Sequence, residues 1–289
     1  MKELFDLSET INYHPAYENI AREKSSLAIE AKSFFQKLYK KYVELNYEEN
    51  NFLDGIKKQW YPRVWELYFT IELMELGFDI SCPKGNAPDV KIQNGNQIIW
   101  IECATLSRGN NAVKEYDNCL LNTLYDEDYI LRITSTIASK YKQIQSHIKS
   151  GIIGSDDIVL IAINSGELTL TEIAQIDFPL IQKALYGIGS ITYSFTTKEV
   201  SNQSRLNIEN HNNRKIKTNY FTTDEYKNIS GIIFSNWKST EIEKNLSESF
   251  ELTHNLFAKN KLQEVFFKIG TEYIPYINGN LGKFKKLAY

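Results

Sequence analysis

The sequence has few of the residues that mark secreted, membrane-spanning or zinc-scaffold proteins. Its three cysteines, Cys82, Cys103 and Cys119, are an odd number without CxxC spacing, so neither a disulfide framework nor a zinc site is expected. No run of 18 uncharged apolar residues occurs, and the N-terminus is too acidic and polar for a signal or transit peptide. We therefore expect free thiols, no membrane span and a cytoplasmic location.

Sequence signatures of several catalytic classes are also missing. No GxGxxG and no GxxxxGK[ST] motif occurs, which argues against a dinucleotide fold and a P-loop NTPase. The four histidines lack metal-ligand spacing, and no Ser/His/Asp or Cys/His order suggests a nucleophilic hydrolase. Since 33 Lys and Arg stand against 36 Asp and Glu, for a net charge of -3, coating of nucleic acid by bulk charge is disfavoured, while a local basic face remains open.

The composition that is present can fill one large domain, because 42% of the 289 residues are hydrophobic and 13% are aromatic. Neither an internal repeat nor a linker-like change of composition divides the chain. We expect an N-terminal helical extension over 1–58, a core over 59–165 and a C-terminal α+β elaboration over 166–289, packed on the same domain. Within the first part, apolar residues at three- and four-residue steps predict one long helix over 19–46.

The core begins with a helix over 61–77, since Pro62 suits a first helical turn and Gly77 suits a C-cap. A tight turn at Asn94-Gly95-Asn96 predicts a hairpin whose second strand is apolar enough to be buried on both faces. The other expected elements are strands over 78–82, 89–93, 98–103 and 157–164, a polar excursion over 107–128 and a helix over 129–149. Their order is α-β-β-β-α-β, which predicts an α/β fold with a central mixed sheet flanked by helices.

The part after residue 165 has a less regular pattern. We expect a helix over 178–186 and strands over 190–196 and 231–234, with a polar segment over 198–219 between them. That segment places Arg214 and Lys215 among Asn, Gln and Ser, side chains that bind phosphates and base edges. A hydrophilic surface loop explains the same composition equally well.

Two acidic residues are placed by the hairpin. Antiparallel pairing around the turn brings Asp89 close to Glu102, so both carboxylates can reach one site if they share a face. Glu102 is embedded in the run IIWIECA, where an ionised side chain is costly unless it is paired or bound to a cation. Mg²⁺ suits two or three carboxylates with water. The alternative is that Asp89 caps a turn and Glu102 pairs with a buried Arg or Lys.

These residues resemble the motif of the PD-(D/E)xK nuclease superfamily, whose restriction-endonuclease-like core has the same element order. Pro88-Asp89 looks like its PD, and Glu102-Cys103-Ala104 occupies its (D/E)xK. The resemblance covers residues 60–164. A helix before the hairpin often supplies a further acidic ligand in that family, and Glu66 is the matching position here.

The chain departs from this family at Ala104, which stands where the motif has its lysine. Some members take the cation from the following helix, where this chain has Arg132, Lys140, Lys142 and Gln143. Lys140 falls at helical spacing from Ile137 and Ile144, so it can point toward the sheet. Lys140 is therefore the expected replacement, with a solvent-exposed helix lysine as the alternative.

The resemblance implies a nuclease that hydrolyses phosphodiester bonds, of restriction or repair type. Mg²⁺ or Mn²⁺ would be held by Glu66, Asp89 and Glu102, with Lys140 as the catalytic cation. DNA is the expected substrate with RNA not excluded, and a homodimer is the expected assembly. Nucleic-acid contacts are expected from Arg63, Arg108, Arg214 and Lys215.

Two other functions fit the same residues. The first is a nuclease-fold protein that has lost cleavage with the motif lysine and that binds nucleic acid or protein. The second is a small-molecule or structural role, in which the acidic cluster is a buried polar network. Whether a cation reaches Glu102 from the helix over 129–149 separates the nuclease from the inactive binding module.

Overall fold

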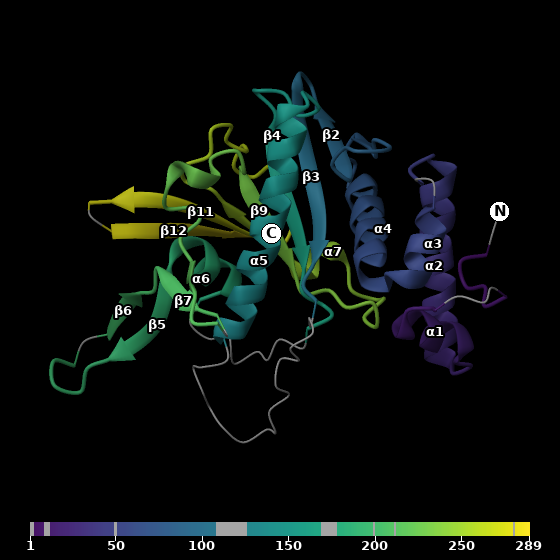
Figure 1. Ribbon diagram of the computed structural model, residues 1–289, viewed down its shortest axis with the longest axis horizontal. Coiled ribbons are helices and arrows are strands. Elements are labelled where there is room, and N and C mark those ends of the chain that lie inside the picture. Colours follow the sequence, from purple (N-terminus) through teal and green to yellow (C-terminus); the bar gives the residue numbers. More distant parts are fainter. Residues whose placement is uncertain are drawn as a thin grey trace.

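The computed structural model describes residues 3–8, 12–48, 51–107, 126–168, 178–198, 200–210, 212–279 and 281–289. It is an α/β protein built around a large mixed sheet with helices on both faces (Figure 1). The expectations for Arg108 and Cys119, and for most of the polar excursion, lie outside the described residues. No helix in the described ranges is both long enough and apolar enough to cross a membrane.

The central sheet has eight strands in the order β1-β2-β3-β4-β9-β10-β11-β12. Strands β3, β4 and β9 are parallel neighbours, β10 runs parallel to β11, and the remaining pairs are antiparallel. The strands are β1 Ile80–Ser81, β2 Val90–Asn94, β3 Gln97–Thr105, β4 Ile158–Asn164, β9 Gly231–Ser235, β10 Phe250–His254, β11 Thr271–Asn278 and β12 Leu281–Ala288. The expected α/β class with a central mixed sheet is confirmed.

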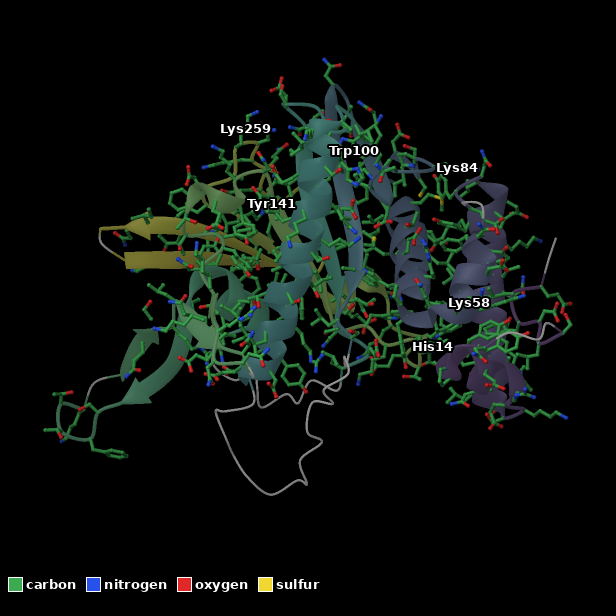
Figure 2. The ribbon with its side chains drawn as sticks, in the orientation of Figure 1. His14, Lys58, Lys84, Trp100, Tyr141 and Lys259 are labelled. Atoms are coloured by element: carbon green, nitrogen blue, oxygen red, sulfur yellow. The ribbon has the colours of Figure 1, made fainter. Side chains whose placement is uncertain are left out.

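Two helices cover opposite faces of β3 because its side chains alternate between them. Helix α4 (Trp60–Glu75) shares one apolar core with Ile99, Ile101 and Cys103. Helix α5 (Asp126–Lys149) shares the other with Trp100 and Ala104 (Figure 2, where Trp100 is labelled). The sequence of β3 is apolar on both faces for this reason, and any charged residue within the apolar run is buried beneath one of the two helices.

The N-terminal segment is helical, but the single helix expected over 19–46 is wrong. The chain forms α1 (Pro15–Arg22) and α2 (Ser26–Glu44), followed by α3 (Phe52–Lys58), all on the side of α4 away from α5 (Figure 1). Glu23 is extended, and its Oε1 accepts from the backbone N–H groups of Lys24 and Ser25. The Ser25 side chain then accepts from the Ala28 N–H, which begins a new helix.

The C-terminal part contains more strand than the sequence pattern predicted. The segment over 198–219 is not a continuous polar loop, because it holds β6 (Val200–Ser204), β7 (Asn207–Glu209) and β8 (Lys215–Lys217). Strand β6 pairs with β5 (Ile188–Tyr193), and β7 pairs with β8, so two small hairpins stand beside the main sheet. The other helices are α6 (Leu180–Tyr186), a 3₁₀ turn at Asp224–Tyr226 and α7 (Leu246–Ser249).

Candidate active site

Asp89 and Glu102 meet at the open end of the β2–β3 hairpin. Strand β2 pairs with β3 through Val90 and Ile101, so position 89 lies across from position 102 on the neighbouring strand. The Asp89 Oδ2 atom accepts a hydrogen bond of 2.7 Å from the Cys103 backbone N–H, which fixes the carboxylate beside β3. The hairpin therefore delivers two carboxylates to one place. A quarter of the Asp89 side chain remains exposed, which leaves this place open to solvent.

The cation at this site comes from helix α5. Lys140 Nζ lies 2.8 Å from Glu102 Oε2 and 3.9 Å from Asp89 Oδ2. The Lys140 side chain is 19% exposed, and it projects from the side of α5 that buries Ile137 and Ile144. Two of the expectations include a contact between Glu102 and Lys140. In one, Lys140 is the relocated catalytic lysine, and in the other the two residues form an ion pair without a catalytic role.

Glu66 approaches from the other face of the sheet, on helix α4. Its Oε2 lies 2.8 Å from Arg63 Nη1, one turn earlier, and its Oε1 accepts a 3.1 Å hydrogen bond from the Tyr42 hydroxyl. The Arg63 guanidinium also lies over the Phe52 ring, 5.5 Å from its centroid. Arg63, expected from the sequence to contact nucleic acid, therefore holds Glu66 and keeps 30% of its side chain exposed.

Electrostatics connects these carboxylates into one group. Burial and the charge of Asp89 together raise the pKa of Glu66 to about 7, although Arg63 and the Tyr42 hydroxyl oppose the rise. Burial also raises the pKa of Asp89 to about 6, with Lys140 opposing the rise and Glu102 adding to it. Three carboxylates, Glu66, Asp89 and Glu102, face two permanent cations, Arg63 and Lys140. The group is therefore short of positive charge, and Glu66 and Asp89 hold protons more tightly than usual.

The donor set suits a hard divalent cation bound mainly by Asp89 and Glu102. Mg²⁺ takes oxygen ligands and usually needs only one or two carboxylates with water, and these two carboxylates already share the Lys140 ammonium. A closed cage of three ligands is not present, since no group of three or more His, Cys, Asp or Glu side chains in the described ranges is placed to hold a metal. Glu66 belongs to the same electrostatic group but is held by Arg63 and Tyr42.

His147 is a member of this group that sequence reasoning missed. Its Nε2 lies 3.1 Å from Glu102 Oε1, so Glu102 is held by His147 on one oxygen and Lys140 on the other. The imidazole is buried, and its Nδ1 atom has no partner within the described part of the chain. The sequence contained one usable signal, because His147 follows Lys140 by seven residues, or two helical turns, and so lies on the same face of α5.

The other expected contact residues are not part of this group. Arg214 and Lys215 lie on the β7–β8 hairpin and form no ion pair with the site carboxylates. On α4, Glu75 is exposed and pairs with Lys41, as a solvated residue would. Glu72 is half-buried, and its Oε2 accepts from the Leu246 N–H at the start of α7.

The raised pKa values predict how the stability of the metal-free protein depends on pH. Native Glu66 and Asp89 keep protons that the unfolded chain releases near pH 4, so their contribution to stability is complete below about pH 4 and is lost as pH rises toward 7. Glu66→Gln cannot ionise, and its single amide oxygen can accept from Tyr42 while its NH2 group then faces Arg63. The loss of the Arg63 contact does not vary with pH, so the free energy of unfolding of the variant relative to wild type is expected to rise by about 2 kcal/mol from pH 5 to pH 8.

Urea melts of both proteins in EDTA, from pH 5 to pH 8, measure this effect. The difference in free energy of unfolding between Glu66→Gln and wild type is expected to grow with pH. A difference that stays constant across that range would show that Glu66 ionises normally in the folded protein.

The four proposed site residues lie on different elements of the fold. Glu66, Asp89, Glu102 and Lys140 come from α4, the start of β2, β3 and α5, and the fold brings them together. Their catalytic roles remain predictions. No protein-family model, no curated protein and no solved structure matches this chain.

Proposed function

We propose that this chain is a metal-dependent nuclease that hydrolyses phosphodiester bonds in DNA, with Glu66, Asp89, Glu102 and Lys140 as its centre. The observation that carries the proposal is the position of Lys140. Its ammonium lies between Asp89 and Glu102, at the place where Ala104 leaves the motif without a cation. Two carboxylates that can hold a divalent cation, beside a lysine that can stabilise charge on the phosphoryl oxygens, supply the groups that metal-dependent phosphodiester hydrolysis uses.

The order of elements supports the same proposal. Helix α4, strands β1 to β3, helix α5 and strand β4 follow one another as α-β-β-β-α-β. This order, with Asp89 before β2 and Glu102 near the end of β3, resembles the restriction-endonuclease-like core of the PD-(D/E)xK superfamily. Membership of that superfamily is part of the proposal.

Each residue would have a distinct role in cleavage. When bound, Mg²⁺ or Mn²⁺ would lower the pKa of a coordinated water and polarise the scissile phosphate. Asp89 and Glu102 would hold the cation through their carboxylate oxygens, and Glu66 would add negative charge from the opposite face. Lys140 would stabilise the charge that develops on the phosphoryl oxygens. His147 and Arg63 would orient Glu102 and Glu66.

A second candidate is an inactive nuclease-fold protein that binds nucleic acid. One observation favours it: every carboxylate of the group already has protein partners. Glu66 is held by Arg63 and Tyr42, and Glu102 by Lys140 and His147. A network satisfied in this way can persist without metal. The two candidates differ in whether a divalent cation binds and in whether DNA is cut.

Cleavage and melting assays separate these candidates. Supercoiled, linear and single-stranded DNA, with RNA beside them, would be incubated with Mg²⁺, Mn²⁺ or EDTA. We expect metal-dependent nicking of DNA, together with a rise in melting temperature when Mn²⁺ is added, since binding to the native state stabilises it by about 2.7 kcal/mol at 100 times the Kd. Product in EDTA, or no product with either metal, would contradict the proposal.

A further inference from the structure

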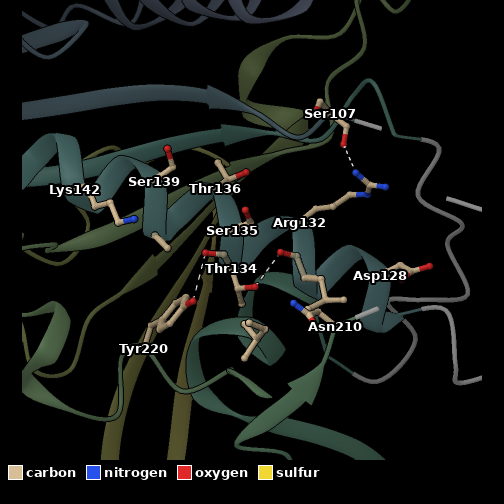
Figure 3. Close-up of a pocket in the computed structure, with 13 residues that line it drawn as sticks. Ser107, Asp128, Arg132, Thr134, Ser135, Thr136, Ser139, Lys142, Asn210 and Tyr220 are labelled. Atoms are coloured by element: carbon tan, nitrogen blue, oxygen red, sulfur yellow. Dashed lines mark hydrogen bonds between the residues drawn. The ribbon is translucent and has the colours of Figure 1, made fainter. Parts of the chain in front are cut away.

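A groove of about 760 Å³ runs along the outer face of α5, between that helix and the β7–β8 hairpin (Figure 3). Its described lining on the helix follows one stripe, because Arg132, Ser135, Ser139 and Lys142 recur at three- or four-residue steps. Ser139 immediately precedes Lys140, so the groove lies on the helix face next to the one that carries the candidate centre. The same helix therefore borders both.

The lining of the groove is chemically suited to a phosphate backbone. Hydroxyl groups of Ser135 and Ser139 lie between a guanidinium at one end and an ammonium at the other. One carboxylate, that of Asp128, lines the groove beyond the guanidinium, one helical turn earlier on α5. Arg132 Nη1 donates to the Ser107 carbonyl at 2.7 Å, which fixes the position of that guanidinium. Lys142 is exposed and has no ion-pair partner among the described residues. Cations with hydroxyl donors are the groups that contact phosphates in protein–DNA complexes.

The spacing of the two cations indicates an extended ligand. Arg132 and Lys142 are ten residues apart on one helix, which is about 15 Å at 1.5 Å per residue. That length corresponds to about four phosphates of one strand at 3.4 Å per nucleotide along a duplex. A single phosphate or a small phosphorylated molecule cannot reach both ends. A polymer of phosphates can.

The opposite wall adds further positive charge. Asn210, which lines the groove, accepts at Oδ1 from the Arg214 backbone N–H in the turn of the β7–β8 hairpin. Arg214 is exposed and has no ion-pair partner in the part of the chain that is described, and it lies two residues before Ile216, which lines the groove. The lysines on either side of Ile216 alternate with it and face away from the groove. Lys215 lines a separate pocket with Arg205 and Glu209, and Lys217 is paired with Glu225 at 2.6 Å.

The groove offers little for reading bases. Its aromatic residue, Tyr220, is 6% exposed, and its ring packs 4.4 Å from that of Tyr226. Tyr220 therefore presents no free face on which a base could stack. Contacts in the groove are expected to be with the backbone, so they contribute affinity without sequence preference and depend strongly on salt.

We propose that this groove binds the phosphate backbone of DNA. The inference deepens the proposed function and rests on it for the choice of partner, because a strand held along α5 passes beside the helix face that carries Lys140. Arg132, Lys142 and Arg214 provide the electrostatic contacts, and none of them belongs to the candidate centre.

Binding measured in EDTA tests the groove independently of cleavage. Fluorescence anisotropy with a labelled duplex would compare wild type, a groove triple variant and a control triple variant. The groove variant combines Lys142→Ala and Arg214→Ala with Arg132→Gln, which removes the charge and keeps a donor for the Ser107 carbonyl. The control, Lys24→Ala with Lys37→Ala and Lys149→Ala, removes three exposed lysines elsewhere that have no ion-pair partner within the described ranges. The groove variant is expected to weaken binding at least tenfold and to reduce the salt slope by two to three, at about one per lost phosphate contact. The control is expected to change binding less than twofold.

The outcomes separate this inference from the proposed function. Equal weakening by the two triple variants, no weakening by the groove variant, or no binding by wild type would overturn the groove. Wild-type protein that binds DNA through the groove but cuts nothing would leave the groove in place and reject the nuclease. If wild type and the groove variant cleave DNA at equal rates and bind it with equal affinity, the nuclease would be supported and the groove rejected.

Discussion

Asp89→Asn is expected to reduce metal-dependent cleavage by at least about 1,000-fold, or about 4 kcal/mol in the activation barrier, while the protein stays folded. Asparagine keeps an oxygen that can accept from the Cys103 N–H, where Asp89 now makes a 2.7 Å bond. It removes the charge that would share a cation with Glu102. The loss is therefore electrostatic and leaves the end of the β2–β3 hairpin intact.

The same substitution is expected to raise stability in the absence of metal. Because burial raises the pKa of Asp89 to about 6, the ionised carboxylate at pH 8 destabilises the folded protein relative to the unfolded chain. Replacing it with a neutral amide removes that cost and lowers the repulsion on Glu66. If Asp89 serves to bind a cation, its substitution should lower activity and raise stability. If Asp89 serves as a hairpin cap, the substitution should lower both activity and stability.

The measurements are the initial rate of DNA cleavage in Mn²⁺ and the melting temperature in EDTA. Asp156→Asn is the matched control, since Asp156 is exposed in the turn before β4 and makes no contact with the site. The control is expected to match wild type in both measurements. Wild-type cleavage by Asp89→Asn would reject the assignment of this carboxylate to the centre.

The residues that the sequence placed correctly are those whose position depends on short-range periodicity. The tight turn at 94–96 set the register of one hairpin, and that register was enough to bring Asp89 beside Glu102. Helical spacing was enough to turn Lys140 toward the sheet. In both cases the apolar neighbours define a face, and the polar residue on that face must follow them.

The parts that the sequence did not reveal depend on contacts between distant segments. His147 reaches Glu102 across 45 residues of sequence, and Tyr42 reaches Glu66 from a helix outside the predicted core. Local periodicity can place His147 on the same helix face as Lys140, but it cannot identify the carboxylate that His147 or Tyr42 contacts. The break between α1 and α2 depends on local capping and not on distant contacts. The apolar spacing continues through Glu23, but side-chain hydrogen bonds of Glu23 and Ser25 end one helix and start the next.

The second prediction concerns the loss of Lys140 from the site. Lys140→Met is expected to lower cleavage at least 100-fold and to destabilise the protein by about 3 kcal/mol, because removal of one partner leaves a buried carboxylate with reduced compensation. Glu102 is 4% exposed, and of its partners among the described residues it would keep His147 alone. Lys149→Met, which changes an exposed lysine at the end of the same helix, is the control and is expected to match wild type.

A lysine placed at the motif position should restore part of this loss. Positions 102 and 104 project to the same face of β3, and Ala104 lies in the core that β3 shares with α5. In the double variant Lys140→Met with Ala104→Lys, the new ammonium can enter the space that Lys140 leaves. We expect at least a tenfold recovery of cleavage relative to Lys140→Met, with recovery of stability, measured by initial rates and urea melts. Recovery of stability without cleavage would mean that Lys140 serves Glu102 as a structural partner alone, whereas recovery of both would show that the chain has moved the cation of its centre from the strand to the helix.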